Sequence, residues 1–303
     1  EVRNNGVIVK LGPNYSGIGQ SVRYSGVGAI NVTAGDFTFA ATSLTALNGS
    51  YTAAGGSTLQ FVGGSRSFGP SATLDGGTLV FGDSGAVAVN TVQTCIGSAS
   101  TVIIRNAELV LDCAGPSDLA GLQMSEPLGV LEGSSAIRVT GSFGWGHGTI
   151  RGSGLGQTFE IAPAATAQFD APQGDLIPRT LSNRRLRNDG TIAWIATNTT
   201  EVNDGGEFAN ELGSQLFLAG SGVRSVTSNA PATSRMTNNG AMIIDDGAVA
   251  DLDVLFDNAG SVQLNNGELS VRRNGNDLGS YSIGSSSLLY FDGAVRSMGP
   301  GSD

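Results

Sequence analysis

Apolar and polar residues alternate over short stretches along most of the chain, and each stretch ends at Gly or Asn. Alternation with a period of two is typical of a β-strand that buries one of its faces. The pattern predicts many short strands, with Val7 and Val9 on the inward face of one and Ile192 and Trp194 on the inward face of another. The best candidate for a helix is a short stretch from Pro116 to Met124.

One unit recurs, in which Asn or a small polar residue precedes Gly and alternating apolar positions follow. It reads NNGVIVKL from Asn4, NDGTIAW from Asn188 and NNGAMII from Asn238. Gly supplies the positive φ that a tight corner requires, and Asn tolerates the same region while bonding to local backbone. We interpret each unit as a corner followed by a strand, and expect asparagines at successive corners to form hydrogen-bonded ladders.

The spacing of the corners predicts how the strands are arranged. Gly26 follows Gly6, Gly260 follows Gly240 and Gly279 follows Gly260 at nearly the same interval. A strand-only repeat of this length is the signature of a solenoid, because each turn buries its apolar face only against its neighbours. We predict an all-β, parallel β-helix of about 20 residues per rung and about 15 rungs, continuous over residues 1–303.

A longer repeat is the most specific feature of the sequence. Residues 49–70 match residues 279–300 at 11 of 22 positions, without gaps and at a constant offset of 230. Tyr51 corresponds to Tyr281 and Arg66 to Arg296. Weaker similarity extends upstream, so that residues 1–70 resemble 235–300. Solenoid ends are open sheet edges, and no cap is recognisable, so we expect adjacent modules or further copies of the protein to stack end to end.

Composition narrows the set of partners. The chain has 46 glycines, only 14% charged residues and a formal net charge of −10, and Lys10 is its one lysine. Diffuse negative charge repels phosphate backbones, and no basic stripe is present, so nucleic acid is not an expected partner. No apolar run approaches the roughly 18 residues of a membrane span.

Three phrases carry a resemblance to known proteins: FGWGHGTIRGSG (143–154), RTLSNRRLRNDGTIAW (179–194) and FDNAGSVQLNNGELSV (256–271). They resemble the Asn- and Gly-punctuated repeats of large secreted microbial and algal β-solenoids, similar to adhesin and autotransporter stalks. The resemblance covers most of the chain and is weakest from Cys95 to Leu131. It implies a right-handed parallel β-helix with an extracellular or cell-surface, adhesive or filament role, and it brings no catalytic motif.

The resulting functional prediction is a non-enzymatic extracellular rod, a segment or subunit of a longer surface protein or filament. Its expected partners are adjacent modules or copies of itself and, in addition, surface glycans. We predict no catalytic residue, cofactor or metal site.

Cys95 and Cys113 are separated by close to the length of one rung. Residues one rung apart lie within the Cα separation that a disulfide tolerates. We therefore predict a disulfide between consecutive turns in an oxidising compartment, with two buried free thiols as the alternative.

Four Asn-x-Ser/Thr sequons occur, and each is a candidate acceptor of an N-linked glycan if the protein is secreted. They begin at Asn14, Asn31, Asn48 and Asn198.

The main competing function is a carbohydrate-active β-helix enzyme, a polysaccharide lyase or hydrolase. The segment IDDGAVADLDV contains Asp245, Asp246, Asp251 and Asp253, and the last two share a strand face. Clustered carboxylates could bind Ca²⁺ or perform acid–base chemistry. No Lys or Arg is nearby in sequence, so a solvated acidic corner is the simpler interpretation.

A third candidate function is a glycan-binding module. Trp145 and Trp194 could stack on a sugar, or Trp145 could fill the interior of a rung. His147 is the single histidine and cannot form a multi-histidine metal site. Flanking glycines suggest that it lies in an open turn. The cluster of Arg184, Arg185 and Arg187 could contact a polyanion, or form a strand face paired with acidic residues.

Overall fold

The computed structural model describes residues 1–43, 45–83, 85, 87–154, 156–171, 175–293 and 295–299. Every element in these ranges is a β-strand, and the strands stack in parallel as a β-solenoid of about 13 turns with about 22 residues per turn. This confirms the predicted all-β parallel solenoid. The turns are longer and fewer than predicted because several corners are extended. Leu216 pairs with Met242 and Met242 pairs with Val262, and the first of these two steps spans the longer stretch of chain.

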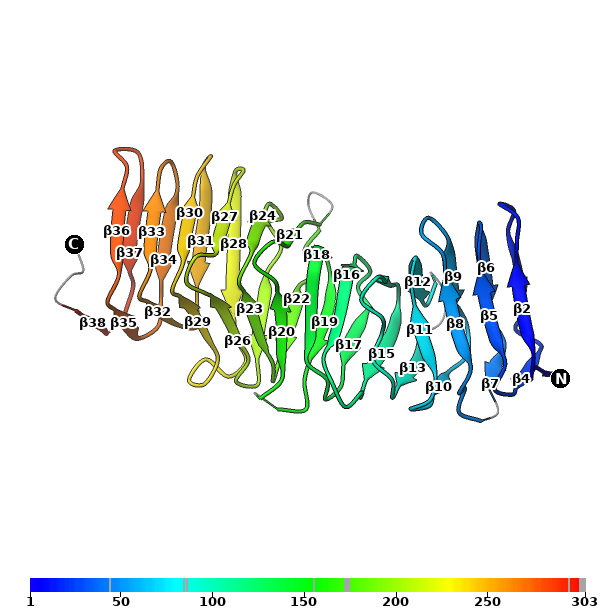
Figure 1. Ribbon diagram of the computed structural model, residues 1–303. Coiled ribbons are helices and arrows are strands. Elements are labelled where there is room, and N and C mark those ends of the chain that lie inside the picture. The colour runs from blue at the N-terminus through cyan, green and yellow to red at the C-terminus, as the bar shows by residue number, and fades with distance from the viewer. Residues whose placement is uncertain are drawn as a thin grey trace. The chain divides into compact units, whose positions relative to one another are not determined.

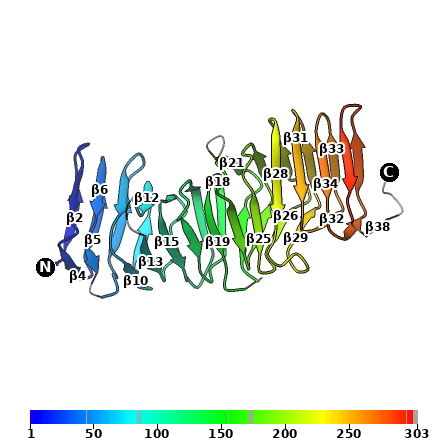
Figure 2. The ribbon, with the colours of Figure 1, turned by 180° about the vertical axis from the view of Figure 1, so that it is seen from behind.

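The chain divides into two compact units, unit 1 (residues 1–139) and unit 2 (residues 140–303). Most turns pass through three sheets in order, which we call the first, second and third sheets of each unit; the turns with β14 (Thr101–Ile104) and β16 (Ser117–Met124) have no strand in the first sheet. Strands that are about one turn apart in sequence lie side by side within each unit (Figures 1 and 2). That residues 1–303 form one continuous solenoid stays a prediction.

In unit 1, the first sheet contains β2 (Val7–Lys10), β5 (Ala29–Val32), β8 (Ser50–Ala53) and β11 (Thr73–Asp75). The second contains β3 (Ser16–Ile18), β6 (Asp36–Phe39), β9 (Thr58–Phe61), β12 (Thr78–Phe81), β14 (Thr101–Ile104) and β16 (Ser117–Met124). The third side is formed by β1 (Val2–Arg3), β4 (Arg23–Ser25) and β7 (Thr42–Ser43), and then by β10 (Arg66–Phe68), β13 (Ala88–Val92), β15 (Ala107–Leu111) and β17 (Val130–Glu132).

In unit 2, the first sheet contains β20 (Thr158–Ile161), β23 (Arg185–Asn188), β26 (Glu207–Asn210), β29 (Arg235–Asn238), β32 (Leu255–Asn258), β35 (Gly275–Asp277) and β38 (Arg296–Met298). The second contains β18 (Ile137–Trp145), in which the unit boundary falls, β21 (Thr166–Phe169), β24 (Thr191–Trp194), β27 (Gln215–Leu218), β30 (Ala241–Ile244), β33 (Ser261–Leu264) and β36 (Ser280–Ile283). The third contains β19 (Gly148–Arg151), β22 (Arg179–Ser182), β25 (Thr200–Asn203), β28 (Gly222–Thr227), β31 (Ala248–Leu252), β34 (Glu268–Val271) and β37 (Leu288–Phe291).

Inward side chains form continuous apolar columns, because the parallel register places equivalent positions directly above one another. In unit 1 the ring of Phe61 stacks on that of Phe81, with centroids 5.2 Å apart, and meets the rings of Phe39 and Phe68 edge-on. In unit 2 Ile192 and Trp194 are buried, as the alternation predicts. Each aromatic side chain therefore closes the interior between two turns.

One local prediction is wrong, the direction of the faces of β2. Val7 and Val9 point outward, with 61% and 47% of their surface exposed, while Ile8 stacks on Ile30 and Lys10 on Val32. The inward position of Lys10 is possible because its ammonium group donates to the carbonyl oxygens of Gly12 and of Ala34, the latter at 3.2 Å. A shift of one residue reverses the faces of a strand.

The best candidate for a helix, residues 116–124, contains strand β16 instead. It pairs with β14, so that Leu122 stacks on Val102 and Met124 on Ile104. Pairing with the preceding turn overrides the weak local preference for a helix. Within the described ranges, no helix has the length and apolar character needed to cross a bilayer.

Glycine is required where corners of consecutive turns press together. A Cβ on Gly260 would lie 2.1 Å from the carbonyl oxygen of Gly240, and one on Gly279 would lie 2.0 Å from that of Gly260. Separations this short are steric clashes, so the corner column at Gly240, Gly260 and Gly279 excludes every side chain. These are the glycines whose spacing predicts the solenoid.

Candidate functional sites

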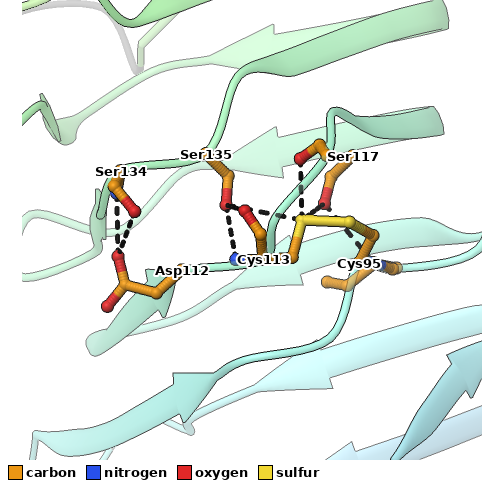
Figure 3. The surroundings of a disulfide bond; sticks show 8 residues. Cys95, Asp112, Cys113, Ser117, Ser134 and Ser135 are labelled. Atoms are coloured by element: carbon orange, nitrogen blue, oxygen red, sulfur yellow. Dashed lines mark hydrogen bonds between the residues drawn. A yellow bond between two sulfur atoms is a disulfide. The ribbon is translucent and has the colours of Figure 1, made fainter. Parts of the chain in front are cut away.

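The predicted disulfide between Cys95 and Cys113 is present, with a Cα–Cα distance of 5.0 Å. Cys95 follows β13 and Cys113 follows β15, the strand that pairs with β13 in the next turn. Figure 3 shows the serines around it: Ser135 Oγ accepts from the amide of Cys113 at 2.7 Å and donates to the Cys113 carbonyl at 3.2 Å. The bond thus joins consecutive turns of unit 1 at one corner.

The predicted asparagine ladder is confirmed in the first sheet of unit 2. Asn188, Asn210, Asn238 and Asn258 occupy successive turns, and each of the first three donates through Nδ2 to Oδ1 of the next at 2.8 Å. The second N–H of Asn210 reaches the carbonyl of Ala241 at 3.1 Å. All four side chains are buried. The ladder satisfies polar groups inside the coil and fixes the register of its turns.

Buried arginines form a second set of interior polar groups, which the sequence does not indicate. Arg66 donates to the carbonyl oxygens of Phe39 and Gly64 at 2.9 Å each. Arg224 donates to those of Trp194 at 3.1 Å, Gly222 at 2.7 Å and Ile195 at 2.8 Å. Each guanidinium therefore ties a corner of its own turn to the corner of the preceding turn.

Burial disfavours the charge of these arginines. It lowers the pKa of Arg66 to about 10 and that of Arg179 to about 9. The guanidinium of Arg179 lies 5.1 Å from the ring centroids of both Phe169 and Trp194, an arrangement in which the ring faces attract the cation. The two rings therefore hold the guanidinium of Arg179 in place inside the coil, which is a structural role.

The predicted Arg184–Arg187 cluster divides between the two faces of its strand. Arg184 is buried, whereas Arg185 lies 2.5 Å from Glu211 and 3.5 Å from Glu207, and Arg187 lies 2.9 Å from Asp189. Arg185 and Arg187 thus agree with the interpretation of a strand face paired with acidic residues. A contact of all three arginines with a polyanion is ruled out because Arg184 is buried.

Of the two interpretations of the Trp145–His147 turn, exposure to solvent is wrong and the filling of a rung by Trp145 is confirmed. Both residues are buried, as is Trp194, so neither tryptophan can stack on an external sugar. His147 Nε2 lies 2.9 Å from Asp175 Oδ2, and its Nδ1 lies 3.3 Å from the carbonyl oxygen of Ile177. The histidine therefore anchors the segment that leads into β22, and Trp145 fills a rung, which was the second interpretation of the sequence.

The aspartates of the 245–253 segment are brought next to arginines by the following turn. Asp251 Oδ1 lies 2.6 Å from Arg272 Nε, and Asp253 Oδ1 lies 2.5 Å from Arg273 Nε. The sequence separation of about one turn hides these partners. Asp245 instead accepts from the amide of Asp246 at 2.7 Å and from Asn265 at 3.3 Å. All four carboxylates belong to a solvated surface.

The four sequons differ in accessibility. Asn14 is exposed, and Asn31 and Asn48 are half-buried. Asn198 is buried and donates to the carbonyl oxygens of Gly146 at 3.0 Å and Ile177 at 2.9 Å. A glycan on Asn198 would have to be attached before this part of the chain folds.

A cavity of about 520 Å³ lies beside β35 and β38. Asp257 is its one carboxylate, and this group accepts from the amide of Asn276 at 2.8 Å. The cavity does not supply the pair of carboxylates that glycoside hydrolysis requires. Among the described residues, no three His, Cys, Asp or Glu side chains are placed to hold a metal ion.

The turn formed by β36, β37 and β38 has an open interior. Its inward residues Tyr281, Leu289 and Phe291 are only half-buried, and 51% of Ile283 is exposed. In sequence this turn is the copy of residues 49–70, in which Tyr51, Leu59 and Phe61 are completely buried. Pro300, the last position of the repeat, lies outside the described residues. We call the β36–β38 surface the open turn.

Comparison with known proteins gives no relative: no protein-family model, curated protein or solved structure matches this chain.

Proposed function

We propose that this protein is a structural and adhesive rod of the cell surface or extracellular space, and that it acts without catalysis. Further solenoid turns, from an adjacent module of the same protein or from another copy, stack on its open turn. The observation that carries this proposal is that two copies of one repeat, identical at 11 of 22 positions, occur in the chain, one covered by a following turn and one uncovered.

In unit 1, residues 49–70 are covered by the following turn. Leu74 of β11 stacks on Tyr51, Phe81 of β12 on Phe61, and Val92 of β13 on Phe68. The open turn has the corresponding strands and keeps the inward Tyr, Leu and Phe as Tyr281, Leu289 and Phe291, and these side chains remain partly in water. Covering them releases about 25 cal/mol per Å² of apolar surface, which favours stacking of another turn.

The interior chemistry also supports a structural role. The asparagine ladder and the carbonyl-bound arginines use their polar groups on neighbouring turns rather than directing them into a cavity. The disulfide of unit 1 is typical of proteins that function in an oxidising compartment, which supports an extracellular location.

A graft tests whether a module turn fits the open turn. Residues 70–92, which continue from the first copy and cover it, would be attached directly after residue 299, so that Pro70 takes the position that follows Gly69 in the first copy. We expect the grafted chain to unfold at a higher urea concentration and to protect the backbone amides of β36 and β37 from hydrogen exchange. A control graft carrying Leu79→Asp and Phe81→Asp should give neither effect. An unchanged exchange rate with the unmodified graft would refute stacking of a module turn.

Stacking of copies is tested by sedimentation and electron microscopy of the protein over a range of concentrations. Ile283→Asp places a charge in the open turn, and Leu212→Asp is a matched control because Leu212 is exposed on a corner. We expect elongated assemblies that Ile283→Asp abolishes and Leu212→Asp preserves. Compact monomers at every concentration, together with an ineffective graft, would contradict the proposed function.

A further inference from the structure

The outward surface of the second sheet of unit 2 contains no charged side chain among its four-residue strands. Strands β21, β24, β27, β30, β33 and β36 read TAQF, TIAW, QLFL, AMII, SVQL and SYSI, and the first and third residues of each face outward. The strands are equal in length and pair without a shift, so this surface is regular. We call it the neutral face.

The other two sheets of unit 2 are charged on their outer surfaces. The first sheet presents Arg185, Glu207 and Arg235 in one register column, and the third presents Glu201, Asp251 and Glu268. The chain as a whole has a net charge of −10. Charge is therefore excluded from one side of the coil, although the same repeat generates all three sides.

Hydrogen bonding separates the neutral face from the others in the same way. Its hydroxyl and amide side chains, such as Thr191, Gln215 and Gln263, make no hydrogen bond to other described residues. On the third sheet, by contrast, Thr180 Oγ1 donates to Glu201 at 3.4 Å and Arg272 binds Asp251. The neutral face keeps its donors and acceptors available for an external partner.

The second sheet of unit 1 independently has the same pattern in part. Thr58, Thr78 and Thr101 form one outward register column. Gln60, Val80 and Ile103 form the neighbouring column, in which Val80 is covered and Gln60 donates to the carbonyl oxygen of Gly82 at 3.4 Å. The charged exceptions are Asp36 in β6 and Asp118 in β16. Strands β9, β12 and β14 of unit 1 thus share the uncharged outer surface of the neutral face, whereas the ends of that sheet do not.

We propose that the neutral face is an adhesive surface for an uncharged polysaccharide, an inference that rests on the adhesive part of the proposed function. A neutral sugar polymer brings no charge that must lose its water on binding, and its hydroxyl groups can bond to the free hydroxyls and amides. Phe217 and Ile243, adjacent in register at the centre of the sheet, offer an apolar strip to the C–H faces of sugar rings. An acidic polysaccharide is repelled by the net charge of the chain.

The test measures binding of the full chain to insoluble cellulose, chitin and mannan, with alginate and polygalacturonate as acidic comparisons. The variant Thr191→Lys/Ser261→Lys places two charges on the neutral face. Its matched control, Thr180→Lys/Ser270→Lys, changes the same residue types on the third sheet, where each lysine lies next to Glu201 or Asp251 in register. Circular dichroism confirms that both variants remain folded.

We expect the chain to bind at least one neutral polymer and neither acidic one. The neutral-face variant should bind about tenfold more weakly, which corresponds to about 1.4 kcal/mol, and the control should bind like the wild type. Equal binding by the two variants, or no binding of the wild type to any neutral polymer, overturns the proposal.

A monomer–dimer equilibrium that the neutral-face lysines abolish, without polysaccharide binding, would also overturn it and would identify the face as a contact between copies. The stacking experiments use the open turn and are independent of these substitutions. Failure of polysaccharide binding is therefore distinguishable from failure of the proposed rod.

Discussion

Residues 49–70 and 279–299 are two copies of one repeat in different settings. The strands coincide at the offset of 230, β8 with β36, β9 with β37 and β10 with β38. Tyr51, Leu59 and Phe61 are completely buried, whereas Tyr281, Leu289 and Phe291 are half-buried. The local sequence therefore sets the strands and the face that points inward, and the following turn decides how much of that face leaves water.

The two copies also differ in how they hold their equivalent arginines. Arg66 is bound by backbone carbonyls, and the position that corresponds to Asp277 in its copy is Leu47. Arg296 instead donates to Asp277 through Nε at 2.7 Å and Nη2 at 2.5 Å, and Asp277 is fully buried. The Asp277 bonds outweigh the effect of burial and raise the pKa of Arg296, whereas burial alone lowers the pKa of Arg66.

The largest expected contrast comes from truncating the same ring in each copy. Phe61→Ala removes a buried ring that packs against the aromatic rings of both neighbouring turns and should cost about 3–5 kcal/mol in the free energy of unfolding. Phe291→Ala should cost less than about half of that, because its ring is already partly in water. Urea unfolding of each variant measures both values. Equal losses would mean that the open turn is covered in solution.

The arginine pair gives the next contrast. Arg296→Met leaves the carboxylate of Asp277 buried without its cation and should cost about 3–5 kcal/mol. Adding Asp277→Leu, which reproduces the Leu47 of the first copy, should recover most of that loss. Arg66→Met removes donors to uncharged acceptors, the backbone carbonyls and Asn90 Oδ1, and should cost about 1–3 kcal/mol. If the double variant is no more stable than Arg296→Met, the unpaired buried carboxylate of Asp277 is not the cause of the stability loss in Arg296→Met.

The turns that precede each copy differ as well. The open turn follows turns that contain the asparagine ladder, whereas the covered copy packs against the aromatic ring of Phe39 in the preceding turn. Asn210→Leu leaves the amide of Asn188 and the carbonyls of Asn238 and Ala241 without partners, at a cost of about 2–3 kcal/mol. Gln263→Leu is the control, because its exposed amide has no partner among the described residues. If Asn210→Leu lowers the free energy of unfolding by less than Gln263→Leu does, the ladder has no stabilising role.

The smallest expected effect concerns alkaline pH. Burial raises the pKa of both Tyr51 and Tyr281, and for Tyr281 the bond to Asp277 adds to the shift. Each tyrosine ionises near pH 10 in the unfolded chain and at higher pH in the folded one, so the contribution of each tyrosine to stability is constant below pH 10 and falls above it.

The alkaline loss should approach about 1.4 kcal/mol per pH unit for each tyrosine. Tyr51→Phe and Tyr281→Phe should each make the decline between pH 10 and 11 shallower in urea unfolding. A decline that neither substitution changes would assign the alkaline loss to other groups.

The corners, the strand alternation and the disulfide could be predicted from the sequence because each depends on local conformation or on a separation of about one turn. The Gly240, Gly260 and Gly279 column and the Cys95–Cys113 bond are examples. The asparagine ladder is predictable for the same reason. These features need only the knowledge that consecutive turns lie directly on one another.

Only the tertiary structure decided which polar residues enter the interior and which partners they find there. Lys10, Arg66 and Arg224 occupy inward positions because backbone carbonyls of neighbouring turns meet their charges, and Arg272 reaches Asp251 across one turn. A strand pattern specifies the period of a face but not its direction, as Val7 and Val9 show. The register against the neighbouring turn selects the direction, because it determines which side chains gain contacts and which remain in water.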